Sequence, residues 1–313
     1  MSSPQLQSTL RIGVLRGGPS TGYDESLETG NFVLQNLVDT HKPIDIFISN
    51  DGAWHMQGIQ KNPEHILKHL DVVFNGLHGT FGEDGKVQDI LASHGVPYTA
   101  SEKYPSSIVM NRWLMKEHLK PLAIKTPVAI LVRHTDSLNE KAKEIWNSIP
   151  APIVVKPAKG GYSHGYYRAD FYQELLQALE EVLATHDSAI AEEHLVGTRA
   201  SSGVIEGFRN KSFYTLTPVE INTENIPSYP TRFNDDQKSE MEKLATLVHK
   251  GLGLRHYSTT DFIVTPRRGI YVLEVNTLPK LGQKSTLKKS LEAVGVSVKE
   301  LVHHLVNLAL NRK

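Results

Sequence analysis

The feature that most constrains this chain is a pair of strand-like segments near its C-terminal end. Residues 271–275 are mostly apolar and of strand length, but Glu274 and Asn276 make the end of this segment polar. Residues 259–264 form a second such segment that contains Asp261, and an Arg-Arg-Gly turn lies between the two. The two segments are therefore predicted to pair as a β-hairpin.

The predicted hairpin gathers oxygen donors at one place. Glu274 and Asn276 are two positions apart, so both side chains lie on the same face of their strand. Pairing with the first strand adds Asp261. Carboxylate and amide oxygens suit Mg2+, which binds one or two carboxylates and completes its shell with phosphates and water. The alternative is a polar strand end that faces solvent.

Length and composition narrow the class of protein. A chain of 313 residues is too long for one small core, so two or three lobes are expected. Basic and acidic residues number 34 each, which predicts no net attraction to nucleic acid or to an anionic membrane. No apolar segment approaches the roughly 18 residues of a membrane span, and residues 1–9 lack the pattern of a signal peptide. The absence of cysteine excludes disulfides and thiolate chemistry and fits a cytosolic protein.

The N-terminal third reads as an open α/β sheet. Residues 10–15 are strand-like, a glycine-rich turn follows, and residues 26–37 have helical spacing. Ligands of such sheets bind at the carboxyl ends of the strands. After another predicted strand, residues 76–85 form a loop with four glycines, two acids and His78. This histidine either packs within the loop or belongs to a site, and the position of the loop favours a site.

The middle of the chain contains basic residues suited to phosphate. Residues 151–157 are predicted to form a strand that ends at Lys156, whose burial is costly unless it meets an anion. The glycine-bearing loop that follows contains Ser163, and its N–H groups are suited to covering phosphates. The alternative is an ordinary hairpin with a surface lysine. Arg112 and Lys116, one turn apart on a helix predicted to end near residue 119, meet phosphate or solvent.

The remaining segments complete the expected organisation. Residues 189–195 are predicted as a strand whose end carries Glu192 and Glu193, which either accept hydrogen bonds from an adenine amino group or a ribose or lie in a solvated turn. Two antiparallel strands are expected within residues 202–216 and an irregular loop within 217–233. Helices are expected at 235–252, 285–293 and 298–310.

Taken together, these motifs resemble the D-alanine–D-alanine ligase family of ATP-grasp enzymes over nearly the whole chain. The resemblance rests on the segments GGPST and SLETG near the N-terminus, GLHGTFGEDGKVQ at 76–88, PYTAS at 97–101, VKP at 155–157 with its glycine loop, and EVNTLP at 274–279. It implies an α/β protein with an N-terminal open parallel sheet domain, residues 1–105, followed by a two-lobed ATP-grasp domain. The central lobe would span residues 106–187 and the C-terminal lobe residues 188–313, with ATP between them.

The resemblance also implies roles for individual residues. Asp261, Glu274 and Asn276 match the ligands of Mg2+, for which Mn2+ is an alternative. The other matching positions contact ATP or an amino acid. They are Lys156, Arg112 and Ser163 at the ATP phosphates, Glu192 with Glu193 and Leu195 at the adenine, and His78 and Ser285 near the first and second amino-acid substrates.

The departures from the family pattern are concentrated at the amino-acid site. The family's turn reads GGxSxEHEVSL, and its first glutamate, which holds the substrate ammonium, corresponds to Gly22. An arginine that steadies the developing oxyanion corresponds to Thr259. The other substituted positions are Tyr162 for a serine, Arg199 for a ribose-contacting glutamate and Lys280 for the glycine after NTLP. Asp24, Arg255 and Lys280 are candidates for replacing the lost charges.

The expected activity is ATP-dependent ligation of a carboxylate to an amine through an acylphosphate. The resemblance implies small amino-acid substrates, D-alanyl-D-alanine or a related dipeptide as product, a role in building cell-wall peptidoglycan, a cytoplasmic location and a homodimer. The alternative is a nucleotide-binding homologue that has lost ligation and acts as a regulator or scaffold. A dinucleotide-dependent dehydrogenase is disfavoured because the first glycine turn, residues 16–22, lacks a full GxGxxG.

Overall fold

The N-terminal lobe is built on a five-stranded sheet, here described from a computed structural model that covers residues 9–160 and 165–311. Its strand order is β4-β3-β2-β1-β5, in which β1 runs parallel to β2 and β5 and the β3–β4 hairpin adds an antiparallel edge. The elements are β1 Arg11–Gly17, α1 Tyr23–Leu37, β2 Lys42–Ile48, β3 Trp54–Met56, β4 Ile59–Gln60, α2 Pro63–Leu67, β5 Val72–Asn75 and α3 Lys86–Ser93.

The central lobe has an antiparallel sheet covered by two helices. Its strand order is β6-β9-β7-β8. Apolar residues of α6 and α7, including Ile145 and Leu175, pack on the strands to form its core. The elements are β6 Ala129–Arg133, α6 Leu138–Ser148, β7 Ile153–Pro157, β8 Tyr167–Ala169, α7 Tyr172–Leu183 and β9 Ser188–Glu193.

The C-terminal lobe has a six-stranded antiparallel sheet with the order β13-β12-β10-β14-β15, and β11 also pairs with β10. Helix α8 packs against this sheet, and its start is fixed by Asn234, whose side chain accepts from the Gln237 N–H. The elements are β10 Thr198–Glu206, β11 Phe213–Thr215, β12 Val219–Ile221, β13 Pro227–Ser228, α8 Asp235–Gly251, β14 Tyr257–Thr265, β15 Gly269–Asn276, α9 Thr286–Ala293 and α10 Val298–Leu310.

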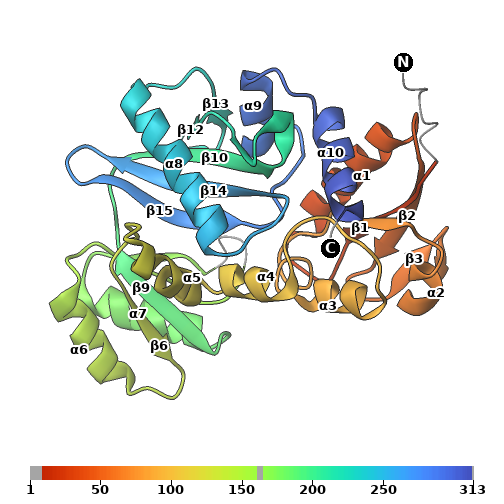
Figure 1. Ribbon diagram of the computed structural model, residues 1–313. Coiled ribbons are helices and arrows are strands. Elements are labelled where there is room, and N and C mark those ends of the chain that lie inside the picture. The colour runs from red at the N-terminus through yellow and green to blue at the C-terminus, as the bar shows by residue number, and fades with distance from the viewer. Residues whose placement is uncertain (1–8, 161–164, 312–313) are drawn as a thin grey trace.

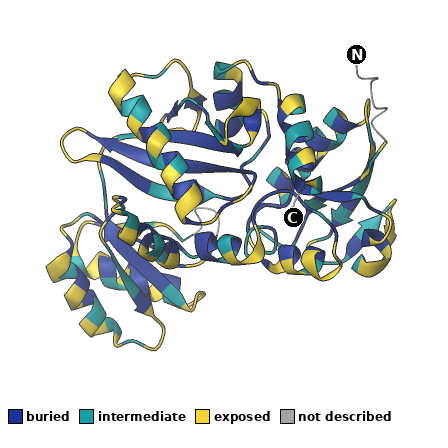
Figure 2. Ribbon diagram, viewed as in Figure 1, coloured by how far each residue is buried: buried dark blue, intermediate teal, exposed yellow. Residues whose placement is uncertain are grey.

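The hydrophobic cores do not follow the order of the chain. Helix α10 packs beside α1 on the N-terminal sheet, where Leu301 and Leu305 share a core with Ile12, whereas α9 packs on β10, β12 and β13 of the C-terminal sheet (Figure 1). Figure 2 shows the strands of the three sheets buried and the outer faces of the helices exposed. The end of the chain therefore ties the C-terminal lobe to the N-terminal lobe.

The helix expected to end near residue 119 is two helices, α4 Lys103–Met110 and α5 Arg112–Leu119. Asn111 between them has an extended backbone, and its side chain accepts from the N–H groups of Trp113 and Leu114. This cap starts α5 afresh and makes Arg112 its first residue. Residues of both helices, among them Met115, pack into the core of the C-terminal lobe.

Two further segments differ from the sequence-based expectations. The polar stretch 217–233, expected to be an irregular loop, contributes the short strands β12 and β13 to the C-terminal sheet. Strand β9, which begins at the expected boundary between the second and third lobes, pairs with β6 and β7 of the central sheet. By sheet membership, we propose that the C-terminal lobe begins after Glu193.

Candidate active site

The predicted hairpin is present as β14 and β15. Asp261 lies directly opposite Glu274 and Thr259 lies opposite Asn276, with a register shift immediately after Asp261. Residues that face each other in an antiparallel ladder project from the same side of the sheet. The hairpin therefore carries Asp261, Glu274 and Asn276 on one face, as the spacing predicted.

The two carboxylates of this hairpin have the electrostatics of a cation site. Oδ1 of Asp261 is buried and has no hydrogen-bond partner among the described residues. Burial, and to a smaller extent the nearby Glu274, raises the pKa of Asp261 to about 6, against the effect of the Ser201 hydroxyl. An unpartnered buried carboxylate oxygen beside a second carboxylate is costly unless a cation joins them. Two carboxylates and one amide fit Mg2+, although residues 9–160 and 165–311 contain no group of three or more His, Asp or Glu suited to a metal.

Arg112 approaches the hairpin from the start of α5. Its Nε lies 3.3 Å from Oε1 of Glu274, and its Nη1 donates to the carbonyl of Pro157 at 3.0 Å. Partial loss of solvent alone would raise the pKa of Glu274, but the positive charges of Arg112 and Lys156 hold it below its ordinary value. Glu274 is thus charged and faces two cations.

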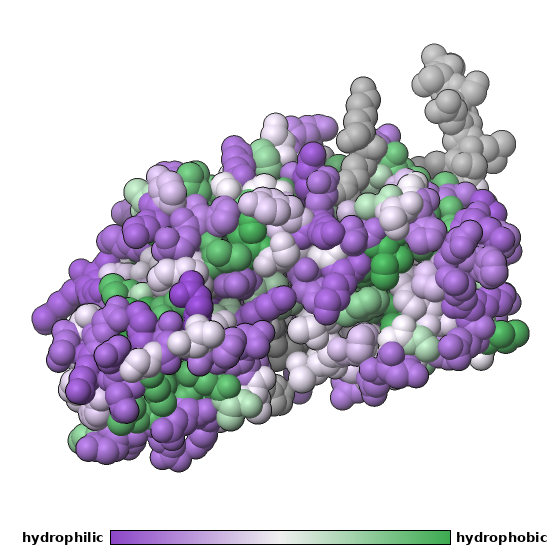
Figure 3. Space-filling view, turned by 90° about the horizontal axis from the view of Figure 1, so that it is seen from below, coloured by the Kyte–Doolittle hydropathy of each residue, from purple (hydrophilic) through white to green (hydrophobic). Residues whose placement is uncertain are grey.

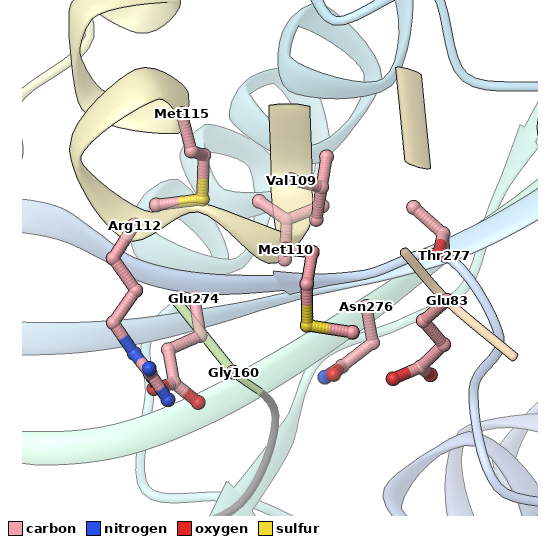
Figure 4. Close-up of a pocket in the computed structure, with 10 residues that line it drawn as sticks. Glu83, Val109, Met110, Arg112, Met115, Gly160, Glu274, Asn276 and Thr277 are labelled. Carbon is pink, nitrogen blue, oxygen red and sulfur yellow. Dashed lines mark hydrogen bonds and ion pairs between the residues drawn. The ribbon is translucent and has the colours of Figure 1, made fainter. Parts of the chain in front are cut away.

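A small cavity of about 60 Å³ lies between the hairpin, α4–α5 and the glycine loop of the N-terminal lobe. Figure 4 shows Arg112 and Glu274 on one side of it, Met110 over its middle, and Asn276 and Glu83 on the other side. Glu83 belongs to the GEDG segment of the N-terminal lobe. The cavity thus connects Glu274 and Asn276, two of the predicted metal ligands, to the loop that carries His78.

A larger cavity of about 560 Å³ lies between the central and C-terminal lobes. Its wall joins charged residues to the apolar side chains of Val154, Ile263 and Leu273. A ligand that joins a flat aromatic base to a charged tail would match such a lining. The sequence-predicted residues in this wall are Arg112, Lys156, Glu192, Glu193, Leu195, Asp261 and Glu274.

Two lysines in this region share one buried glutamate. Lys156 Nζ lies 2.5 Å from Oε1 of Glu192, and Lys116 Nζ lies 3.1 Å from Oε2. Burial would raise the pKa of Glu192, but the two ammonium groups hold it below its ordinary value. Burial lowers the pKa of Lys116 despite the neighbouring acid. Of the two lysines, Lys156 lines the large cavity, so an anion bound there would meet its ammonium group.

Glu193 has structural partners on two sides. It accepts from the Val128 N–H at 3.0 Å, and its Oε2 lies 2.6 Å from Nη1 of Arg268, in the turn of the β14–β15 hairpin. Glu193 therefore bridges the central sheet and the metal-type hairpin while it lines the large cavity. Sequence reasoning singled out this glutamate but not its arginine partner.

His78 is buried in the N-terminal lobe. Its Nε2 lies 2.8 Å from Oγ1 of Thr29, and its Nδ1 lies 3.8 Å from Oε1 of Glu83. The interaction with Glu83, which lines the small cavity, connects His78 to the candidate site. Ser285 instead caps α9, accepting from the Lys288 N–H. Tyr162 and Ser163 lie outside the described residues.

The residues at the substituted positions, and those proposed to replace the lost charges, differ in their exposure and in their partners. Asp24 and Arg255 are exposed. Lys280 pairs with Glu25 at 3.0 Å, and Thr259 is buried. Arg199 lines the large cavity and donates to Oδ1 of Asn225. Tyr166 also lines this cavity, and neither the local pattern nor a motif in the sequence indicated it.

Comparison with known proteins identifies both halves of the chain. Residues 57–101 match the family model for the D-ala D-ala ligase N-terminus, and residues 120–307 match that for the C-terminus. A D-alanine–D-alanine ligase of Fervidobacterium nodosum is 32% identical over 96% of this chain and 99% of its own length.

Solved structures agree in fold. A D-alanine–D-alanine ligase from Coxiella burnetii has a TM-score of 0.88 at 23% identity, covering 98% of this chain and 95% of its own. That of Bacillus anthracis, solved with ATP, has a TM-score of 0.81 at 27% identity and covers 96% and 97%. Among the described residues, the helices are too short or too polar to cross a membrane. The surface seen in Figure 3 is mainly hydrophilic, with hydrophobic side chains in small separate groups.

Proposed function

This chain belongs to the D-alanine–D-alanine ligase family of ATP-dependent, peptide-bond-forming enzymes, and we propose that it joins two small D-amino acids into D-alanyl-D-alanine or a related dipeptide. The observation that carries this proposal is that two cavities are lined by the same hairpin residue. Glu274 lines both the large cavity between the ATP-grasp lobes and the small cavity that leads to the His78 loop. A phosphoryl group positioned beside Glu274 would therefore be close to the carboxylate of an amino acid bound at the N-terminal lobe.

The large cavity supports a proposed mode of ATP binding. The adenine lies against Val154, Ile263 and Leu273, with Glu193 and Leu195 at its edge. The triphosphate extends toward Lys156 and Arg112, whose charges neutralise its oxygens. Asp261, Glu274 and Asn276 would hold Mg2+, which would stabilise the charge that develops in phosphoryl transfer.

Orientation of the two amino acids and ATP then supplies much of the rate, so the reaction requires no enzyme nucleophile. The carboxylate of the first amino acid attacks the γ-phosphorus, and ADP leaves. The amine of the second amino acid attacks the resulting acylphosphate carbon, and inorganic phosphate leaves. We place the first amino acid beside His78 and the second toward Ser285. A cytoplasmic location and a homodimeric state are expected of this family and remain part of the proposal.

The experiment is to measure phosphate release from Mg-ATP with single and paired D- and L-amino acids, with mass detection of products. Release that requires D-amino acids and yields a dipeptide supports the proposal. ATP binding without release for any pair would instead favour the nucleotide-binding regulator. The presence of all three residues suited to a metal, Asp261, Glu274 and Asn276, argues against that alternative, because a chain that no longer transfers phosphate has no need to keep them.

A further inference from the structure

Two departures from the family pattern contact each other. In the turn pattern GGxSxEHEVSL the position of Glu25 is valine, and the position of Lys280 is the glycine after NTLP. Although these residues are 255 positions apart, Lys280 Nζ lies 3.0 Å from Oε1 of Glu25. The two substituted positions thus form an ion pair between the N-terminal lobe and the loop after β15.

The ion pair is held in place by the surrounding backbone. On α1, Thr29 lies one turn after Glu25 and accepts from the Leu281 N–H at 3.4 Å, and Glu28 accepts from the Gln283 N–H at 3.0 Å. Helix α1 therefore carries the loop that contains Lys280. The two charged side chains face each other across a fixed junction rather than meeting at a flexible surface.

The junction adjoins the amino-acid side of the candidate site. Oγ1 of Thr29, which accepts from the Lys280 loop, is also 2.8 Å from Nε2 of His78. Partial burial would raise the pKa of Glu25, but its hydrogen bonds with Lys280 and the backbone, and to a smaller extent the nearby His78, hold it below its ordinary value. The small cavity begins at Glu83, which is 3.8 Å from the other side of the His78 ring.

This ion pair favours one kind of side chain on the substrate. Glu25 and Lys280 remain 33% and 43% exposed, so water reaches both side chains. A methyl group would displace that water and return no hydrogen bond. A hydroxyl accepts from the ammonium and donates to the carboxylate, which keeps the pair neutral and satisfied. A carboxylate or an ammonium on the substrate would compete with one partner and leave the other unpaired.

We propose that Glu25 and Lys280 form a specificity-determining pair that selects a hydroxyl-bearing amino acid, with D-serine as the simplest example, over alanine at the position beside His78. This inference rests on the proposed function. The amino acid at this position is the one that is phosphorylated, so it becomes the N-terminal residue of the dipeptide. Because the pair is partly exposed, the expected preference is on the order of tenfold rather than the larger values of fully buried polar sites.

The test is a competition between equimolar D-serine and D-alanine, with the N-terminal residue of each dipeptide identified by fragmentation in the mass spectrometer. The wild-type enzyme should place serine first about ten times as often as alanine. The double variant Glu25→Val with Lys280→Gly, which restores the family pattern, should shift this ratio at least tenfold toward alanine. Lys280→Met, which keeps the length of the side chain, should shift it in the same direction.

A second ion pair provides the matched control. Lys299 Nζ lies 2.8 Å from Oδ2 of Asp39, and this pair also joins the end of the chain to the N-terminal lobe. The Lys299 side chain is 43% exposed and that of Asp39 is 69% exposed. Asp39→Ala with Lys299→Ala should leave the ratio unchanged. An unchanged ratio in a folded double variant and in Lys280→Met overturns the inference while leaving the ligase function standing. If the wild-type enzyme makes no dipeptide from any amino acid, the proposed function itself fails.

Discussion

Nε of Arg112 lies 3.3 Å from Oε1 of Glu274, joining the first residue of α5 to the C-terminal end of β15. Arg112 also donates to the Pro157 carbonyl at the end of β7. One guanidinium therefore touches the proposed metal hairpin and the strand of Lys156. Its fixed orientation makes Arg112 a link between all three elements that surround the proposed phosphate site.

Replacing Glu274 by glutamine should abolish turnover without unfolding the chain. Glutamine keeps the size of the side chain but removes one of the two charges proposed to hold Mg2+, and 45% of the Glu274 side chain is exposed, so little packing is lost. We expect phosphate release to fall at least about 100-fold, with the thermal midpoint nearly unchanged. Glu144→Gln, at an exposed pair in the central lobe, is the control. Normal magnesium-dependent turnover in Glu274→Gln would show that the metal assignment is wrong.

Replacing Arg112 should affect ATP binding in proportion to the charge that is lost. Arg112→Ala removes a charge-assisted contact to phosphate, so we expect the KM for ATP to rise about 10- to 100-fold. Arg112→Lys restores the residue usual in the family and should raise the KM for ATP only about threefold or less, because the charge remains while the fork geometry is lost. Initial rates against ATP concentration measure both. Equal KM values in the two variants would exclude a direct contact with phosphate.

Local patterns were enough to predict the strands that carry the candidate site residues. The alternation of Glu274 and Asn276 and the turn after Asp261 determined the hairpin, which the register confirms. The Lys156 strand and the paired acids at 192 and 193 were also recognisable, because polar residues at the end of an apolar strand need a partner. These features depend on neighbours within a few residues, and such information is written in the local sequence.

Contacts between distant segments were not predictable. The pairing of Glu25 with Lys280 and of Glu193 with Arg268 depends on how lobes meet. The break between α4 and α5 was missed because Asn111 is compatible with a helix interior, and only its capping bonds reveal the new start. Strands β12 and β13 were missed because short strands with prolines are stabilised by pairing with β10 and each other rather than by their own pattern.

The carboxylate of Glu206 should make stability depend on pH. Its Oε2 accepts from the His256 N–H at 2.6 Å, and its Oε1 lies 3.5 Å from Nε2 of the buried His249. Burial would raise the pKa of Glu206, but these histidine contacts hold it below its ordinary value. The stabilisation is therefore present above the unfolded pKa of about 4.3 and is lost as the pH falls through the lower folded value.

The matched variant for this contact is Glu206→Gln. Glutamine keeps an acceptor for the His256 N–H but removes the charge. We expect a lower urea midpoint than in the wild-type protein at pH 7, and the difference between the two midpoints should shrink as the pH falls below about 4.3. Urea unfolding of both proteins from pH 7 to pH 3.5 measures this. A difference that stays constant over this range would show that the loss is one of packing rather than of charge.

Replacing Glu192 should lower the stability of the fold strongly, because the charges of two buried lysines are paired with its carboxylate. Glu192→Ala would leave Lys156 and Lys116 side by side without a counter-charge, and removal of one partner from a buried ion pair costs about 3–5 kcal/mol. Asp170→Ala is the control, because its pair with Arg168 is exposed and contributes about 1 kcal/mol or less. Urea unfolding gives both values. Saturating Mg-ATP should restore part of the stability lost in Glu192→Ala, since its phosphates supply the missing negative charge, whereas a variant that ATP does not stabilise would place the triad outside the nucleotide site.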